Sequence, residues 1–204
     1  MSSDVEVVER TRMHQGYASV DRIRLRHRLF AGGWSGAITR ELIERGHAVG
    51  VLPYDPTRDE VVLIRQFRVG AWGAGCDPWM VETVAGIIEE GETPEQVARR
   101  ETLEECGCTL TALHRVCDYL ASPGVMTECI TLYCGITDAS GTGGIFGLDH
   151  EGEDVQAFTA SLRDVWTDVQ AGRMMDAKVM LLVNWIWQNR ESLVSRLSRP
   201  KDRL

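Results

Sequence analysis

The sequence predicts a mixed α/β fold, because three kinds of pattern occur along it. Apolar residues alternate with charged ones near the N-terminus, nearly continuous apolar runs follow, and amphipathic segments close the chain. The first two patterns are typical of half-exposed and buried strands, and the third of helices that cover a sheet. The predicted strands are 19–30, 37–44, 47–53, 61–67, 80–85, 112–120 and 126–136, and the predicted helices are 94–106, 161–171 and 176–190.

The N-terminal part, residues 1–46, predicts a small antiparallel β subdomain ahead of a larger domain at 47–204. Residues 1–16 are polar and predict a frayed lead, and AGGWSG at 31–36 is a turn signal. Two or three short strands are not stable alone. We therefore expect this subdomain to pack on the rest of the chain or on a second subunit.

The helix at 94–106 carries explicit start and stop signals. Thr93 can cap its N-terminus, Pro94 suits the first helical position, and Gln96 can close a capping box. Gly107 is the matching C-terminal stop. The last helix presents an apolar stripe that predicts a core-facing side, formed by Val179, Leu182, Val183 and Ile186.

Several segments predict loops. Residues 55–60 predict the turn between the strands at 47–53 and 61–67, and residues 70–79 predict a loop containing Gly and Trp. Residues 138–153 form a long Gly-rich stretch that ends in acids. Loops of this length without regular structure are uncommon and are often functional.

The amino-acid composition limits the kinds of partner that we expect the protein to bind. The chain has 204 residues, 44% hydrophobic and 25% charged, with a net charge of −8. A negative net charge argues against general binding to a nucleic-acid backbone. No apolar run approaches the length of a membrane span, the N-terminus lacks the apolar core of a signal peptide, and no Cys-x-x-Cys occurs among six cysteines. We expect a cytoplasmic protein with reduced thiols and no membrane or nucleic-acid partner.

The stretch GIIEEGETPEQVARRETLEECGC, residues 86–108, is the strongest functional signal. Glu101, Glu104 and Glu105 stand at i, i+3 and i+4 of the predicted helix and therefore share one face. Like charges in this arrangement repel, more so when the face is partly buried, and a divalent cation would remove the penalty. Mg²⁺ prefers hard oxygen ligands and often shares its shell with phosphates. The alternative is an ordinary solvated acidic helix.

This stretch resembles the Nudix box, G-x5-E-x7-R-E-U-x-E-E-x-G-U, in which U is apolar. Thr102 and Cys108 depart at two U positions, but both are small enough for a packed face. Every fixed position is filled, by Gly86, Glu92, Arg100, Glu101, Glu104, Glu105 and Gly107.

Beyond the box, residues 20–190 look like the bacterial ADP-ribose pyrophosphatases of that superfamily. The supporting segments are RLRHRLF, RELIERGHAV, VVLIRQFR, ASPG with Pro123, and GLDHEGED. The resemblance implies an α/β/α sandwich around a mixed sheet, preceded by a small β domain that swaps across a homodimer. It also implies a composite active site that takes a small nucleotide sugar.

The resemblance implies roles for the acidic residues and their neighbours. Glu101 and Glu105 would bind Mg²⁺, Glu104 a second or third ion, and the Ala85 carbonyl would be a further ligand. Mn²⁺ could replace Mg²⁺, with two to three ions per site. Arg100 would be oriented onto box acids such as Glu92.

Two acids at the end of the Gly-rich loop complete this implied set. Glu151 would deprotonate the attacking water, and Glu153 would add a metal ligand. A surface acidic loop tip is the alternative for both, and His150 is an alternative base that the family pattern does not require.

Three further residues match positions that contact the nucleotide sugar. Arg40, contributed by the partner subunit, and Arg68 would contact the nucleotide, and Glu128 would recognise the terminal ribose. The alternative for the arginines is an ordinary strand surface. Trp72 and Trp79 could stack on a ligand, but half-buried core positions are favoured for them.

The implied reaction is Mg²⁺-dependent hydrolysis of ADP-ribose to AMP and ribose 5-phosphate. The box cannot distinguish this from cleavage of another nucleoside diphosphate sugar such as GDP-mannose. A non-catalytic ADP-ribose sensor is the alternative of another class. The intact acids and the lack of a helix-turn-helix pattern disfavour the sensor. Cys106 and Cys108 are interpreted as buried small hydrophobes.

Overall fold

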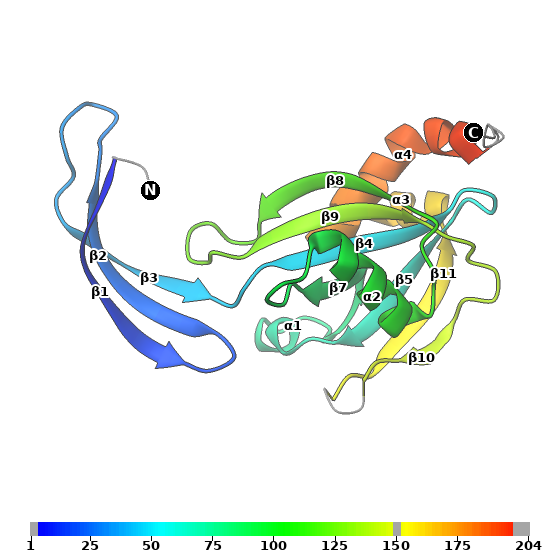
Figure 1. The fold of residues 1–204 in the computed structure, drawn as a ribbon, viewed down its shortest axis with the longest axis horizontal. Helices are drawn as coiled ribbons and strands as arrows, with labels where there is room; N and C mark the ends of the chain where they lie inside the picture. The colour runs from blue at the N-terminus through cyan, green and yellow to red at the C-terminus, as the bar shows by residue number, and fades with distance from the viewer. Residues whose placement is uncertain (1–3, 149–151, 198–204) are drawn as a thin grey trace. The chain divides into compact units, whose positions relative to one another are not determined.

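The computed structural model describes residues 4–148 and 152–197, and the chain divides into two compact units (Figure 1). The N-terminal unit comprises residues 1–47 with the segment 119–130, and the main unit comprises 48–118 with 131–204. Each unit is built around a sheet of its own.

The N-terminal unit contains a three-stranded antiparallel sheet in the order β1 (Val5–Gln15), β2 (Ser19–His27), β3 (Ile38–Glu44). The expectation of a frayed lead at residues 1–16 was wrong, because β1 pairs with β2 along its length. All of β1 is exposed, so it has no buried face to impose an alternating pattern. Buried Asp21 of β2 instead holds β1 by accepting hydrogen bonds from Arg10 and Arg12.

A mixed eight-stranded sheet forms the centre of the main unit in the described part of the chain. Its path runs β10-β11-β5-β4-β9-β8, with β6 pairing β5 and β7 pairing β4. The strands are β4 (Ala48–Asp55), β5 (Glu60–Phe67), β6 (Trp79–Glu82), β7 (Val84–Ile87), β8 (Ala112–Leu120), β9 (Cys129–Ile136), β10 (Gly144–Phe146) and β11 (Val155–Ser161).

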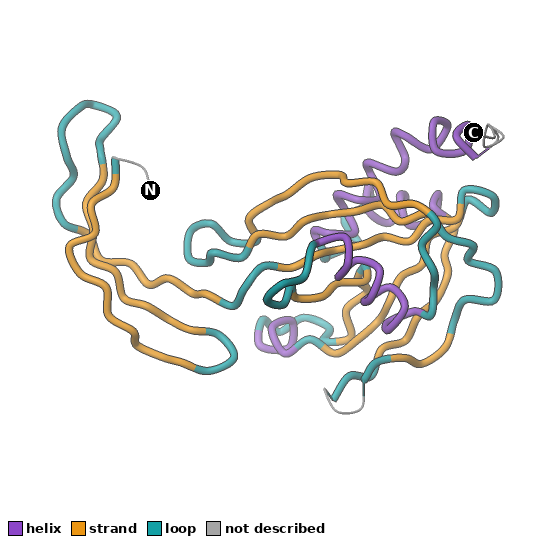
Figure 2. Tube along the Cα trace, viewed as in Figure 1, coloured by secondary structure: helices purple, strands orange, loops and turns teal. Residues whose placement is uncertain are grey.

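Helices cover both faces of this sheet, as Figure 2 shows. The helices are α1 (Val69–Gly73), α2 (Pro94–Cys106), α3 (Leu162–Gln170) and α4 (Ala177–Leu197). Alternation along β4 separates the two layers. Val49 and Val51 join the apolar cluster under α2, whereas Gly50 between them faces Lys178 of α4. The predicted α/β/α sandwich is therefore confirmed.

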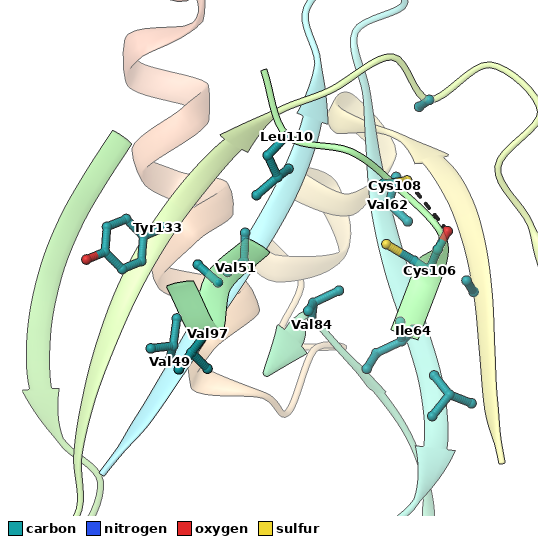
Figure 3. Packing of buried hydrophobic residues seen from close by; sticks show 14 residues of the cluster. Val49, Val51, Val62, Ile64, Val84, Val97, Cys106, Cys108, Leu110 and Tyr133 are labelled. Atoms are coloured by element: carbon teal, nitrogen blue, oxygen red, sulfur yellow. Dashed lines mark hydrogen bonds between the residues drawn. The ribbon is translucent and has the colours of Figure 1, made fainter. Parts of the chain in front are cut away.

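The core under α2 is built from branched side chains of the sheet. Figure 3 shows Val49, Val51, Val62 and Ile64 beside helix residues such as Val97. Fully burying each such side chain contributes roughly 1.5–3 kcal/mol. This packing fixes the height and rotation of α2 over the sheet.

The prediction that two cysteines are buried as small apolar groups is confirmed. Cys106 and Cys108 are buried in the same cluster as small apolar groups, and the Cys108 thiol donates to the Cys106 carbonyl (Figure 3). No disulfide joins any of the six cysteines, all of which lie within the described ranges.

The ends of α2 are as predicted. The Thr93 hydroxyl accepts from the Gln96 backbone N–H, and the Gln96 side chain accepts from the Thr93 N–H at 2.8 Å, which completes the capping box. Gly107 adopts a left-handed φ of 69°, and its N–H reaches the Leu103 carbonyl at 3.0 Å. Because both ends are fixed, the register of the carboxylates along α2 is fixed as well.

Several elements differ from expectation. Strand β11 was not predicted, and the expected strand at 80–85 is divided into β6 and β7. The predicted loop at 70–79 contains the short helix α1, and the Gly-rich loop contains β10, which pairs with β11. Helix α4 continues past residue 190, because buried Leu193 extends its apolar stripe by two turns.

No helix in the described ranges is long and apolar enough to cross a membrane.

Candidate functional site

A bend between two strands creates the floor of the candidate site. β6 pairs with β5 and β7 pairs with β4, so the chain changes neighbour at Thr83. The Thr83 hydroxyl donates to the Val51 carbonyl, and its N–H donates to Asp176 at 3.4 Å. These bonds anchor the bend, and the chain continues directly into Ala85 and Gly86 of β7, which contacts α2.

Gly86 allows Glu101 of α2 to lie directly against the strand. A Cβ at Gly86 would fall 1.8 Å from Glu101 Oε1 and 2.1 Å from its carboxyl carbon, far inside van der Waals contact. The φ of Gly86 is not in the left-handed region. The glycine at this position is therefore required by the close approach of a carboxylate and not by backbone conformation.

Glu105 is the most deeply buried acid of the box. It is 2% exposed, and its Oε2 accepts from the Ala85 N–H at 3.0 Å. Burial, aided by the negative charges of Glu101 and Glu153, raises its pKa to about 8 against the opposing Ala85 hydrogen bond. Additional positive charge nearby would favour the ionised form of this carboxylate at neutral pH.

Glu101 is also desolvated, but its hydrogen-bond partner is the charged side chain of Arg100, whereas Glu105 accepts from a backbone N–H. Burial raises its pKa to about 7, although the neighbouring Arg100 acts in the opposite direction. The charges of Glu104 and Glu153 add to the rise. Two desolvated carboxylates with elevated pKa values at one place are typical of a functional site.

Arg100 organises the acidic face of α2. Its guanidinium makes a paired contact with Glu92, with Nε–Oε1 at 3.0 Å and Nη2–Oε2 at 3.1 Å. Its remaining Nη1 donates to Glu101 at 2.8 Å and to Glu104 at 3.1 Å. The expected orientation of Arg100 onto box acids is confirmed, and its hydrogen bonds lower the pKa of Glu92.

Glu153 brings the loop after β10 into the same electrostatic environment. Its carboxylate accepts from the Leu148 N–H at 3.4 Å, and its charge acts on both Glu101 and Glu105. The structure thus places four of the predicted acids in one region of the main unit. Glu151 and His150 lie outside the described residues.

The oxygens of this region suit a hard divalent cation, although they are not arranged as a finished cage. Across residues 4–148 and 152–197 no group of three His, Cys, Asp or Glu side chains is already placed to hold a metal. Glu101 and Glu104 turn to Arg100, and Glu105 turns to the Ala85 N–H. The desolvated carboxylate oxygens fit an oxygen-preferring ion.

Arg68 lies at the edge of this acidic region and is held by a buried acid. Its Nε donates to Glu82 at 2.7 Å, and Lys178 Nζ lies 3.8 Å from the other Glu82 oxygen. The charge of Arg68 also acts on Glu105. Sequence reasoning missed Glu82, although an acid inside the apolar run MVETVA was a usable signal.

The other two predicted ligand contacts belong to the N-terminal unit. Arg40 on β3 is exposed, and its guanidinium donates to the Thr39 carbonyl at 2.8 Å. Glu128 is buried, with Oε1 3.3 Å from Nε of Arg45. Their roles toward a ligand stay predictions.

The expectation of half-buried core positions for two tryptophans was wrong. Trp72 is 66% exposed and Trp79 is 50% exposed. Trp79 contacts Phe67 edge to face, with ring centroids 5.9 Å apart, on the paired ends of β6 and β5. Trp72 lies in the short helix α1, which has no buried residue, and Trp79 is the first residue of β6, paired with the last residue of β5.

Comparison with known proteins agrees with this geometry. The family model described as NUDIX domain matches residues 44–178. The chain is 41% identical to the ADP-ribose pyrophosphatase of Escherichia coli (strain K12), over 94% of this chain and 91% of the relative. It is 35% identical to the ADP-ribose pyrophosphatase of Haemophilus influenzae, over 91% and 87%. It is also 35% identical to the GDP-mannose pyrophosphatase of Cronobacter sakazakii, over 71% and 75%. The chain belongs to the NUDIX domain family.

Proposed function

We propose that this protein hydrolyses the diphosphate bond of ADP-ribose, yielding AMP and ribose 5-phosphate. The observation that carries the chemistry is the pair of desolvated carboxylates, Glu101 and Glu105, set against Gly86 and Ala85. The substrate is supported by the relatives named ADP-ribose pyrophosphatase, which match over nearly the whole chain. The GDP-mannose pyrophosphatase matches over 71% of it.

The proposed cofactor is Mg²⁺, with Mn²⁺ as a substitute. Glu101, Glu104, Glu105, Glu153 and the Ala85 carbonyl would hold two to three ions. A divalent ion bound there would neutralise phosphate oxygens and lower the pKa of a bound water. The raised pKa values of Glu101 and Glu105 indicate that nearby protein groups do not fully compensate the negative charge of these ligands, and a bound cation would do so.

The protein's own groups would orient the substrate and the water. Arg100 fixes the carboxylate face by its paired contact with Glu92, and Glu82 holds Arg68 at the edge where a guanidinium can bind a phosphate oxygen. Glu151, outside the described residues, is the proposed general base.

The proposed assembly is a cytoplasmic homodimer with a composite active site. Residues 1–46 would exchange between subunits, and Arg40 of one subunit would then contact the nucleotide in the other. Glu128 would hydrogen bond the hydroxyls of the terminal ribose, for which a buried carboxylate acceptor is suited.

A substrate panel tests the proposal. ADP-ribose, GDP-mannose and other nucleoside diphosphate sugars are incubated with the protein and Mg²⁺, and the products are identified by chromatography. We expect the highest kcat/KM for ADP-ribose, with AMP and ribose 5-phosphate formed in equal amounts. A higher kcat/KM for GDP-mannose would assign the protein to the other activity.

The thermal stabilisation caused by Mg²⁺ should grow with pH. The pKa values of Glu101 and Glu105 are raised to about 7 and about 8 in the folded protein. Between the unfolded pKa and these values the folded state binds more protons, so the metal-free protein loses stability as pH rises. Metal binding requires ionised carboxylates and therefore strengthens over the same range.

The measurement is Tm by calorimetry with and without Mg²⁺ between pH 6 and pH 9. An ion at 100 times its Kd stabilises by about 2.7 kcal/mol, or roughly 5–10 °C for a chain of this size. We expect a shift of this order at pH 8.5 and a much smaller one at pH 6. A shift independent of pH would contradict binding at these two carboxylates.

A further inference from the structure

Gln66, the penultimate residue of β5, is a buried polar side chain that the proposed mechanism does not use. It is 6% exposed, and its Nε2 has no hydrogen-bond partner in the part of the chain that the structure describes. Buried polar side chains almost always find a partner, and an unmet donor destabilises the fold. Such a group requires an explanation.

The strand register places Gln66 on the floor of the carboxylate region. On one side it pairs with Met80 of β6. On the other side, β11 pairs Ala157 with Ile64, and the same register continued by two residues sets Val155 beside Gln66. Side chains alternate along a strand, so Gln66 shares the face of Ile64, which packs in the core under α2.

Charged groups of the site surround the next position on this face. Two residues beyond Gln66 stands Arg68, just past the end of β5. If the register of β11 extended beyond its observed pairs, Glu153 would lie opposite Arg68. Both Arg68 and Glu153 act electrostatically on Glu105. Gln66 therefore lies between the apolar core and the charges that hold the proposed metal and phosphates.

We propose that the Nε2–H of Gln66 donates a hydrogen bond to a diphosphate oxygen of the bound substrate. The site needs donors for an anion, and the acids around it can supply none when ionised. A neutral amide adds a donor without pairing with Glu105 or Glu153 as another cation would. This inference rests on the proposed function and adds a residue to its substrate contacts.

The test compares Gln66→Met with the matched control Gln156→Met. Methionine has a similar unbranched shape but no donor. Gln156 is exposed on β11 and pairs with Arg65, on the opposite face of the same strands. Three quantities are measured for each protein: Tm without metal, Kd for the non-cleavable α,β-methylene analogue of ADP-ribose with Mg²⁺, and kcat/KM for ADP-ribose.

For Gln66→Met we expect Kd to rise and kcat/KM to fall by about 10- to 100-fold, the range for a hydrogen bond to a charged group. The Tm without metal should stay equal or rise, because an unmet donor has been removed. Gln156→Met should match the wild type in all three quantities.

Two results would overturn the assignment of Gln66. One is a Kd and kcat/KM within twofold of the wild type. The other is a lowered metal-free Tm with full recovery of Kd at low temperature, which marks a packing role. A wild-type protein that binds the analogue but does not cleave ADP-ribose overturns the proposed reaction, while the Kd comparison still decides the role of Gln66. A wild-type protein that does not bind the analogue overturns both.

Discussion

Replacing Glu105 by Gln should reduce Mg²⁺-dependent hydrolysis by about 10³-fold while stabilising the metal-free protein. The loss corresponds to roughly 4 kcal/mol of transition-state stabilisation, a size expected when a metal ligand is removed. Glutamine keeps an oxygen that can accept from the Ala85 N–H, so the contact at 3.0 Å is retained. What disappears is the negative charge that the ion requires.

The gain in stability should depend on pH in a defined direction. Burial raises the pKa of Glu105 to about 8, so above this pH the wild type keeps a desolvated charge that the variant lacks. Because the carboxyl keeps its ordinary pKa of 4.5 in the unfolded chain, the variant should already be more stable at pH 6, and its advantage should grow with pH until about pH 8. Calorimetry of the metal-free proteins at pH 6 and pH 9 measures this difference.

The matched control is Glu90→Gln, an exposed acid outside the fixed box positions. It should retain wild-type turnover, Mg²⁺ response and Tm. If Glu105→Gln keeps its rate within tenfold of the wild type at saturating Mg²⁺, Glu105 is not a metal ligand.

Adding one methyl group at Gly86 should reduce turnover by about 10²-fold, out of proportion to its effect on folding. The new Cβ would lie 1.8 Å from Glu101 Oε1, so the carboxylate must leave its position. Displacing a catalytic group by about 1 Å can cost 10²-fold in rate. The obstructing atoms are the end of a flexible side chain, so the loss of stability should be at most about 1–3 kcal/mol.

Kinetics and denaturant titration of Gly86→Ala measure the two effects separately. Gly73→Ala is the control, because Gly73 has no positive φ and a Cβ added there would meet no atom within 4 Å. It should leave both quantities near wild type. A Gly86→Ala protein that turns over normally would show that Glu101 does not act from this position.

The parts of the fold that were predicted correctly are those determined by residues close together in the sequence. The bounds of α2 follow from Thr93, Gln96 and Gly107, which act within one helical turn of its ends. Strand β1 was missed because both of its faces are exposed, so its order depends on pairing with β2 and on Asp21. Such pairing is set by residues distant in sequence and leaves no periodic pattern.

The site shows the same division. Fixed spacing placed Glu101, Glu104 and Glu105 on one helix face, because helix geometry alone sets that relation. The contact between Glu105 and Ala85 joins residues 20 apart in sequence, and the pair of Arg68 with Glu82 joins residues 14 apart. Contacts of this kind depend on the bend at Thr83. That Gln66 Nε2 has no partner among the described residues becomes apparent only when burial and hydrogen bonds are known together.

The most direct test of the central claim is ³¹P NMR of ADP-ribose incubated with the protein, first without divalent metal and then with Mg²⁺. We predict that the two diphosphate resonances persist without metal, and that Mg²⁺ replaces them with two monophosphate resonances of equal intensity, for AMP and ribose 5-phosphate. EDTA should stop the conversion. Diphosphate resonances that survive in Mg²⁺, or products that form equally well in EDTA, would contradict the claim that the box carboxylates act through a bound cation to split this bond.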